Sequence, residues 1–474
     1  MSDFREEALF GRLPLLREER EYSTRGILAT GFTYAVAAWC FLIGGYAANY
    51  VGAVQGIVTL IGGCVIGVAL SAAASALACN RYGLEQIDYA KTCFGQNGAK
   101  LILVFYVINQ IGWTGMVLVM FGRGVLNVAG GFGWHGGPWL VRGAVLFGVL
   151  LSYAIVVRGV HVLNVFNSIV TPGLLLATGL LFFSLFHHGG WPAIVAAAPL
   201  EPTSSQGLNY VLSLELGLGA GFSWWPGIGF LTRNTDSQRN SFYPQVLTMG
   251  LGMGVVCCSG LLAALLFRSY DPTVWMIQVG GKIFGAAALL LVAIANVSAS
   301  AIMMYTAGLG LRHVKAFRAL PWPTLAAVGF LPVFAYVAIP ETLYANGSAF
   351  LTYNATMFAP ISGILLVDYF LLRRQQLDAA QVFEDHPSGK FRFQGGFNLP
   401  ALGSMLFGQL LYVWLLNPVS SVAHGPTELL TASGPAVLLP MALYYLLARL
   451  ILVPSGQGGY RAPPVPLPLR QPNL

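Results

Sequence analysis

Charged residues are scarce in this sequence. Aspartate, glutamate, lysine and arginine make up 9% of its 474 residues, whereas hydrophobic residues make up 56%. Soluble domains carry about 25% charged residues. Apolar runs of about 20 residues, long enough to cross about 30 Å of hydrocarbon, recur along the whole chain. The scarcity of charge excludes a large soluble domain, and we expect an integral membrane protein.

Patterns for metal binding and catalysis are missing as well. None of the six cysteines forms a C-x-x-C pair, and the histidines show no H-E-x-x-H spacing. The cysteines are therefore interpreted as small packing residues, and no metal or cofactor is expected. A membrane enzyme would need nucleophiles, bases or metal ligands clustered at membrane depth, and the sequence offers no such cluster. The charged segment 1–25 is not typical of a cleavable signal peptide.

Twelve apolar segments are expected to cross the membrane as helices. They cover residues 26–50, 53–79, 99–127, 139–157, 161–186, 208–231, 244–268, 283–311, 322–340, 343–372, 398–416 and 432–452. With the N-terminus in the cytoplasm, 21 of the 25 lysines and arginines fall on the cytoplasmic side, and four fall outside: Arg123, Arg142, Arg268 and Lys282. This bias predicts an inner-membrane protein with both termini in the cytoplasm.

The net charge of +7 is therefore explained by topology. The expected partners are the lipid bilayer and a small substrate, with no nucleic acid, and the protein is expected to be a monomer.

The sixth apolar segment is interrupted by GAGFSWWPGIG, residues 219–229. Pro226 removes a backbone donor, and the glycines around it weaken a helix. Irregular backbone at membrane depth is tolerated only where protein or a water-filled cavity satisfies its polar groups. Interrupted helices at matching positions of two halves indicate a transporter site.

The first apolar segment carries Gly31 and Gly44-Gly45 around an aromatic centre. Because it lies five segments before the sixth, we expect two five-helix halves with inverted topology. They span 26–187 and 208–372, between a cytoplasmic tail (1–25) and two further helices (398–452) with a Pro-rich tail (453–474). The alternative is that the glycines only permit close helix packing.

Several stretches resemble, in family order, the nucleobase:cation symporter-1 family, which includes purine and cytosine permeases. They are NRYGLEQIDYAKTCFGQNGAKL (80–101), SWWPGIGFLTR (223–233), ANVSASA (295–301), PISGILLVDYFLLRRQQLD (360–378) and FNLPALGSMLFG (397–408). The similarity is closest to the bacterial pyrimidine-type branch. It implies an all-α integral membrane fold of twelve transmembrane helices, with a leucine-transporter-like 5+5 inverted repeat plus two extra helices. It also implies symport of a nucleobase or related planar heterocycle with a cation by alternating access.

A planar ring needs aromatic faces for stacking and a few polar groups that bind its edge. The resemblance places Trp113 at the family's stacking aromatic in helix three, and the second stacking residue at or beside Phe222, with Trp224 as the next choice. The expected substrate-binding set is completed by Gln110, Ser223, Trp225, Asn296 and Ser300.

Some positions depart from the family pattern. Phe230 stands where an aspartate is frequent, Ile294 and Ala295 stand where the sodium site has two hydroxyls, and Ser300 replaces an asparagine. Backbone carbonyls can still coordinate a cation without those side chains. The expected positions are Ala37, Ala38, Phe41 and Leu291.

Glu215 is the acidic residue that lies well inside a predicted span. An ionisable group there suggests function, and we expect it in the outer access path, where it would bind a proton. The coupling ion is therefore H+ or Na+, with H+ favoured. A hydrated vestibule residue is the alternative role for Glu215.

Two other functions stay open. One is an amino-acid or other small-solute transporter of the same fold, although YAVAAWCF (34–41) is poorly suited to the glycine-rich gap that binds a substrate carboxylate. The other is a membrane sensor, which would bind its ligand without accumulating it. The sequence does not name the heterocycle.

Overall fold

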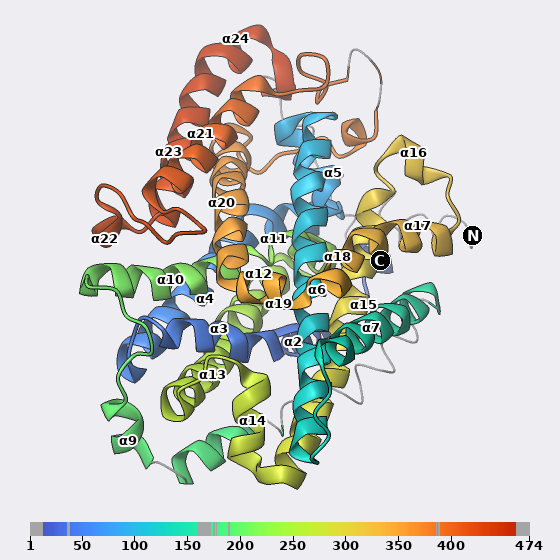
Figure 1. The fold of residues 1–474 in the computed structure, drawn as a ribbon. Helices are drawn as coiled ribbons and strands as arrows, with labels where there is room; N and C mark the ends of the chain where they lie inside the picture. The colour runs from blue at the N-terminus through green and yellow to red at the C-terminus, as the bar shows by residue number, and fades with distance from the viewer. Residues whose placement is uncertain are drawn as a thin grey trace.

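The computed structural model describes residues 13–35, 38–158, 172–173, 176, 178–187, 190–384, 386 and 389–460. Within these residues the chain is helical, and its β-structure is limited to three isolated bridges. The expected all-α class is confirmed (Figure 1).

The helices of the first half begin with a short turn and include two long rods. They are η1 (Arg17–Glu19), α2 (Thr24–Ala35), α3 (Ala38–Ala48), α4 (Ala53–Tyr82), α5 (Gln86–Phe94), α6 (Gly98–Gly131) and α7 (Pro138–Arg158). A further apolar helix covers Thr178–His187.

The helices of the second half start after a short segment, α9 (Gly190–Ala196). They are α10 (Gln206–Phe222), α11 (Trp225–Thr232), α12 (Gln238–Gln245), η2 (Val246–Gly252), α13 (Met253–Phe267), α14 (Pro272–Gly280), η3 (Gly281–Gly285), α15 (Ala286–Leu311), α16 (Lys315–Arg318), α17 (Trp322–Phe330), η4 (Leu331–Val333), α18 (Phe334–Ala338), α19 (Pro340–Ala345), α20 (Gly347–Leu366) and η5 (Val367–Leu372).

The C-terminal part packs beside α20 (Figure 1). Its elements are η6 (Ala380–Val382), α21 (Leu399–Leu415), α22 (Thr427–Leu430), α23 (Ser433–Leu447), η7 (Ala448–Leu452), α24 (Val453–Ser455) and η8 (Gln457–Gly459).

Seven helices in the described part of the chain are long and apolar enough to cross a membrane. They are Ala53–Tyr82, Gly98–Gly131, Pro138–Arg158, Gln238–Phe267, Pro272–Leu311, Gly347–Leu372 and Ser433–Ser455. The pair Thr24–Thr33 and Ala38–Ala48, bent by 57°, makes an eighth. The ninth and eleventh expected spans correspond to the shorter apolar helices Trp322–Ala338 and Leu399–Leu415. The sixth corresponds to α10 and α11, and most of the fifth lies outside the described residues.

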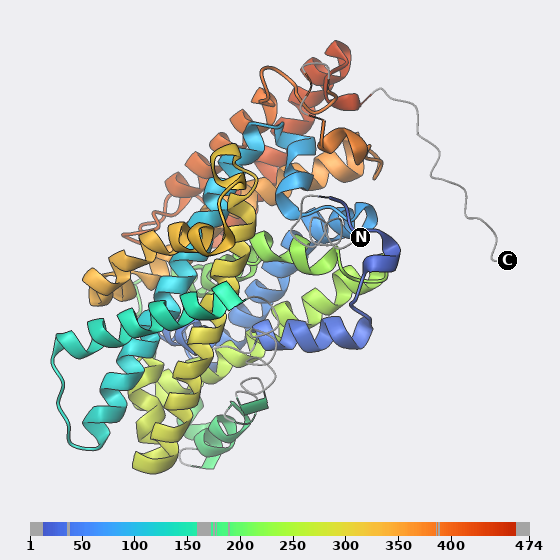
Figure 2. The same cartoon turned by 90° about the vertical axis from the view of Figure 1, so that its right-hand side faces the viewer.

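Helix pairing between the halves follows the inverted repeat. Helix α3 packs on α13, which is the second span of the other half, and α4 packs on α10, which is the first. The third spans, α6 and α15, run side by side through the molecule (Figures 1 and 2). These reciprocal contacts are what two structurally equivalent, inverted halves produce. The packing therefore agrees with the inverted repeat that the positions of the two interrupted segments predict.

Close backbone contacts hold the reciprocal pairs together. A Cβ atom on Gly63 of α4 would lie 2.6 Å from the carbonyl oxygen of Leu214, and one on Gly221 of α10 would lie 2.7 Å from the Cα of Gly67. Small residues allow membrane helices to approach this closely, which maximises van der Waals contact. The contact fixes α4 against the helix that carries the sixth-span break.

We expect Gly63→Ala to destabilise the protein by about 1–3 kcal/mol, because the added methyl group overpacks a backbone contact. Gly62→Ala is the matched control, since a Cβ there meets no heavy atom within 4 Å. Thermal unfolding in detergent would compare the two. Equal stability of both variants would contradict the importance of this contact.

Candidate functional site

The first span is interrupted between α2 and α3. Helix α2 ends at Ala35, α3 begins at Ala38, and the Cys40 thiol donates a hydrogen bond to the Ala35 carbonyl at 3.0 Å. Ala38 and Phe41 are buried on the α3 side of the interruption. Ala37, expected as a cation-coordinating position, lies outside the described residues. Leu291, the expected position on α15, is half-buried.

The sixth span is interrupted between Phe222 and Trp225. Ser223 and Trp224 separate α10 from α11, and Pro226 is among the first residues of α11. Proline is tolerated in the first turn of a helix, where its missing N–H leaves no bond unmade. The interruption therefore falls just before Pro226, as the sequence predicts. Helix α10 also contacts α3, so the two interrupted spans are neighbours.

Four aromatic rings meet at these interruptions, and we call them the tryptophan cluster. The ring centroid of Trp39 lies 5.0 Å from that of Trp113 and 5.8 Å from that of Trp224, with interplanar angles of 56° and 57°. Phe350 of α20 lies 5.4 Å from Trp113 in an edge-to-face contact. The cluster therefore joins α3, α6, the sixth-span break and α20.

The other two candidate aromatics of the sixth span face a different core. Phe222 is 0% exposed, and Trp225 stacks on Phe358 with centroids 5.5 Å apart. Both belong to the apolar cluster around α5, α20 and α21. The stacking role of Phe222 stays a prediction, and Trp224 is the ring of this segment that joins the cluster, through Trp39.

Polar side chains lie next to the cluster along α6. The Gln110 amide donates to the Thr306 hydroxyl and to the Met303 carbonyl of α15. The Asn109 amide donates to the Asn354 side chain of α20 at 2.8 Å. The remaining amide oxygen of Asn109 and the remaining amide nitrogen of Asn354 have no hydrogen-bond partner in the part of the chain that is described. These groups retain hydrogen-bonding capacity close to the aromatic rings.

Asn296 and Ser300 of α15 differ in their surroundings. Ser300 bonds the Ser152 hydroxyl of α7 and its own helix at Val297, so it joins two helices and its expected substrate contact is not supported. Asn296 is 1% exposed, and neither polar atom of its side chain has a partner within the described residues. An unsatisfied buried amide costs about 1–3 kcal/mol, so such groups need an explanation. The Ser223 hydroxyl bonds Ala220 of its own helix.

Glu215 is buried against the C-terminal helices. The side chain is 1% exposed, and it accepts hydrogen bonds from the Tyr412 hydroxyl, the Ser433 hydroxyl and the backbone N–H groups of Ala432 and Ser433. The carboxylate therefore binds the N-terminus of α23, where the helix dipole favours negative charge. The expected position in the outer access path stays a prediction, and a carboxylate that is this fully hydrogen-bonded does not favour a proton-carrying role.

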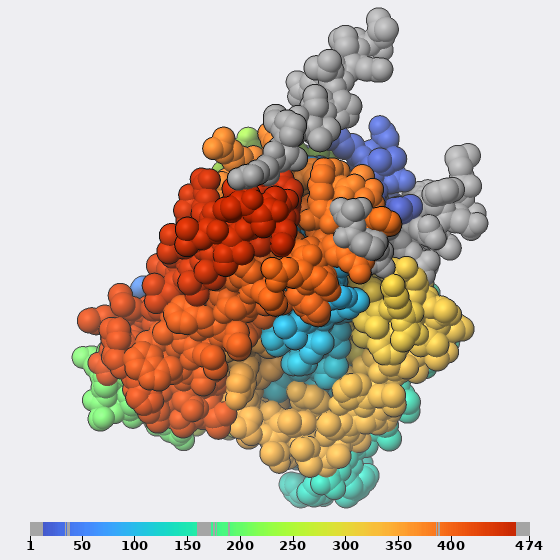
Figure 3. Space-filling model, turned by 90° about the horizontal axis from the view of Figure 1, so that it is seen from above, coloured from blue at the N-terminus to red at the C-terminus, as the bar shows by residue number. Residues whose placement is uncertain are grey.

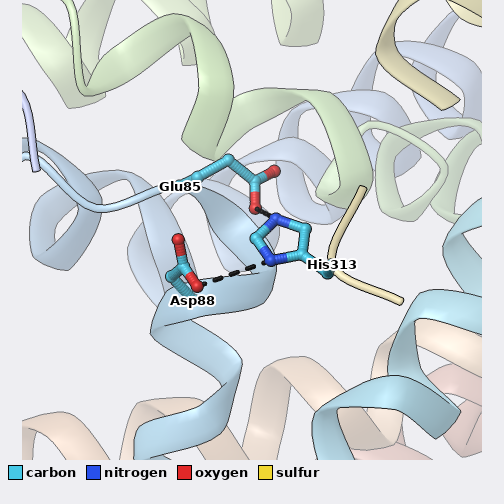
Figure 4. A group of neighbouring side chains, drawn as sticks. All are labelled: Glu85, Asp88 and His313. Carbon is cyan, nitrogen blue, oxygen red and sulfur yellow. Dashed lines mark ion pairs between the residues drawn. The ribbon is translucent and has the colours of Figure 1, made fainter. Parts of the chain in front are cut away.

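A second polar group lies at the end of the molecule that contains α5. The Nε2 atom of His313 is 3.2 Å from a Glu85 oxygen, and its Nδ1 atom is 3.5 Å from an Asp88 oxygen (Figure 4). The carboxylates approach opposite ring nitrogens, and Lys91 pairs with Asp88. Buried Arg233 also interacts electrostatically with both acids. Because Lys91 and Arg233 already balance the charges of the two carboxylates, the arrangement favours an ion-pair network over a metal site.

Three of the stretches that resemble the symporter family, 80–101, 360–378 and 397–408, meet at this same end. Buried Arg373 pairs with Asp368 at 2.6 Å and donates to the carbonyl oxygens of Thr92 and Gly458. The Asn398 amide donates to the carbonyl of Cys93. From above, the cyan surface of α5 and the start of α6 lies between the orange and yellow segments (Figure 3). Most of these stretches therefore join helix ends and do not line the tryptophan cluster.

Trp39 and Phe350 were not among the residues expected from the sequence. Trp39 follows the interruption of the first span, and Trp224 lies at the interruption of the sixth, so the two occupy similar places in the inverted halves. This symmetry is a sequence signal that would have identified Trp39. Phe350 lies in a tenth span with several other aromatic residues, so no comparable signal identifies it.

Two interrupted helices, inverted halves and an aromatic cluster between them define a membrane transporter of the leucine-transporter-like fold. The family of permeases for cytosine/purines, uracil, thiamine and allantoin matches residues 14–434. The chain belongs to this family. The expectation of a transporter and not an enzyme is confirmed.

Individual relatives are distant. A purine-uracil permease of Arabidopsis thaliana is 24% identical over 380 residues, which cover 73% of this chain and 61% of that protein. An allantoin permease of Bacillus subtilis (strain 168) is 22% identical over 359 residues, covering 70% and 71%. The chain thus spans less than two thirds of the plant relative.

Solved structures support the same fold. Mhp1, a nucleobase-cation-symport-1 family transporter in a closed conformation with bromovinylhydantoin bound, superposes with a TM-score of 0.73 at 17% identity, covering 95% of this chain and 99% of that one. MhsT in complex with L-phenylalanine gives a TM-score of 0.51 at 14% identity, covering 82% and 98%.

We expect Glu215→Ala to destabilise the protein by about 2–4 kcal/mol, because buried donors of α21 and α23 lose their acceptor. Glu428→Ala removes an exposed carboxylate that bonds Ser205 and should change stability by less than about 0.5 kcal/mol. Chemical unfolding of the two purified variants would measure the difference. A Glu215→Ala protein as stable as wild type would contradict the capping role.

Proposed function

We propose that this protein imports a nucleobase or related planar heterocycle, of pyrimidine type, together with a cation by alternating access. The observation that carries the proposal is the tryptophan cluster at the point where the two interrupted helices meet. The purine-uracil and allantoin permeases among its relatives have substrates of this shape. Aromatic stacking contributes about 1–3 kcal/mol per base in nucleic-acid binders.

The substrate would stack on Trp113 and Trp224, with hydrogen bonds to its edge from amide groups of α6 and α20. Gln110 is the nearest expected polar residue, one helical turn before Trp113 on α6. The Asn109 amide oxygen adds one hydrogen-bond acceptor, and the Asn354 amide nitrogen adds one donor. A ring with alternating donors and acceptors on its edge fits such a set.

A cation would bind beside the first interruption. Carbonyl groups of Ala38 and Phe41, with the backbone near Leu291, are the proposed ligands, and the unsatisfied Asn296 amide adds a side-chain oxygen on α15. Helix α15 contacts α3. We favour Na+ over H+, because Glu215 is fully engaged in capping α23 and oxygen ligands suit a hard metal cation.

Alternating access needs closure at both ends, and each end has an ion-pair network. At one end Arg123 of α6 pairs with Asp271, the N-cap of α14, and with Glu341 of α19. At the other end His313 lies between Glu85 and Asp88. Opening toward either side requires one network to separate while the other stays closed. With Arg123 outside, both termini are cytoplasmic in the inner membrane, which a reporter fused after Leu474 would check.

We expect Trp113→Ala and Trp224→Ala each to weaken substrate affinity by about 1–3 kcal/mol, or roughly 5- to 150-fold, through lost stacking. Trp225→Phe is the control, because Trp225 stacks on Phe358 in the separate core. Uptake of labelled uracil and allantoin by proteoliposomes gives the concentration dependence. Unchanged affinity in both alanine variants would remove the cluster from the substrate site, and binding without accumulation in wild type would indicate a sensor. Competition by free amino acids would indicate an amino-acid transporter.

We expect an inward Na+ gradient to drive this uptake, and Asn296→Leu to raise the Na+ concentration for half-maximal uptake about tenfold or more, corresponding to about 1.4 kcal/mol of lost coordination. A pH gradient without Na+ should drive little uptake. The result against this proposal is uptake driven by the pH gradient alone and abolished in a folded Glu215→Gln protein.

A further inference from the structure

We propose that Trp39 occupies the stacking position of the substrate when the site is empty, and that its displacement sets the affinity and the ring size that the protein accepts. The inference rests on the proposed function, because it concerns the same site. It assigns to Trp39 an effect opposite in sign to that of Trp113 and Trp224. Those two residues stabilise the bound ring, whereas Trp39 competes with it.

The first argument is geometric. Aromatic pairs prefer ring centroids about 4.5–7 Å apart, and Trp39 meets this range with Trp113 at 5.0 Å and with Trp224 at 5.8 Å. The Trp39 indole is thus placed against both rings on which the substrate would stack. A planar heterocycle cannot share that space with an indole, so one ring must replace the other.

The second argument concerns which part of α3 is free to move. Gly44 and Gly45 lie against the backbone of Cys257 and Tyr270, where an added Cβ would come within 1.9 Å and 2.0 Å of carbonyl oxygens. Gly260 of α13 fits as closely against Phe41. The C-terminal part of α3 is therefore fixed on α13 and on the segment that follows it. Trp39 precedes these contacts and lies near the start of α3, so displacement of its ring leaves the fixed part of the helix in place.

The third argument is thermodynamic. If Trp39 leaves the site free for only a fraction of the time, the apparent dissociation constant of the substrate equals its intrinsic value divided by that fraction. Removing the indole then tightens binding, and it leaves a space of indole size. If Trp39 instead formed a third wall of the site, its removal would weaken binding, as removal of Trp113 would. The sign of the change separates the two roles.

The first test compares uracil with hypoxanthine, a one-ring and a two-ring heterocycle, in proteoliposome uptake. We expect Trp39→Ala to lower the half-saturating concentration about 5- to 20-fold for hypoxanthine, with a smaller decrease for uracil, and Trp39→Phe to lie between Trp39→Ala and wild type. Weaker binding of both rings by a folded Trp39→Ala protein would overturn the proposal.

The second test needs no natural substrate. Apolar cavities made by truncating a side chain bind small aromatic molecules, so Trp39→Gly should bind free indole, seen as a rise in thermal unfolding temperature. Trp275→Gly is the matched control, because Trp275 is also a buried tryptophan and contacts Phe41 of the same helix α3. We expect both variants to bind indole, and hypoxanthine to displace it only from Trp39→Gly.

The outcomes distinguish failure of the Trp39 proposal from failure of the proposed transport function. Indole binding to Trp39→Gly that hypoxanthine displaces supports a ring site at Trp39, even where wild type accumulates neither heterocycle and the transport proposal fails. Failure of Trp39→Gly to bind indole, while Trp275→Gly binds it, overturns the Trp39 proposal and leaves the proposed function standing. Indole binding that hypoxanthine does not displace also overturns it.

Discussion

Every backbone polar group inside a membrane must find a partner within the protein, and the structure depends on this requirement. An interruption in a spanning helix frees such groups, so it is stable only where neighbouring helices surround it. Close glycine contacts supply that surrounding: α4 lies against α10 through Gly63 and Gly221, and α3 lies against α13 through Gly44 and Gly260. Helices α3 and α10 also contact each other, so the first and sixth spans are neighbours. The aromatic cluster is a consequence of that arrangement.

Several charged groups within the helical body form ion pairs. Arg123 with Asp271, His313 with Glu85 and Asp88, and Arg373 with Asp368 each join elements far apart in sequence. Breaking a buried pair leaves an uncompensated charge, at a cost of several kcal/mol. The first two pairings lie at the ends of the molecule, where they favour closure, while the aromatic centre between them contains no ion pair in the part of the chain described. Such a centre suits an uncharged ring.

Much of the fold could be predicted from the sequence. The length of each apolar segment indicates a membrane span, and Pro226 marks the interruption of the sixth span, and both are local features of the chain. The side-chain assignments at the site depend on helix rotation, which a broken helix makes hard to predict. Phe222, Trp224 and Trp225 are neighbours in sequence, yet only Trp224 joins Trp39. Glu215 resembled a functional carboxylate because an acid in a membrane span usually is one. Its role as a cap depends on α21 and α23, which no pattern around Glu215 indicates.

The capping of α23 by Glu215 makes the two broken helices mechanically unequal. Helix α10 is tied through this carboxylate to the appended helices α21 and α23, whereas its counterpart α3 packs on α13 within the repeat. Helices α3 and α10 occupy equivalent places in the two halves, yet only α10 is bonded to helices outside the repeat through Glu215. A rearrangement that moves α10 must also move the C-terminal helices, so the lighter α2–α3 side offers the smaller moving part, and the symmetry of the fold does not extend to its motion.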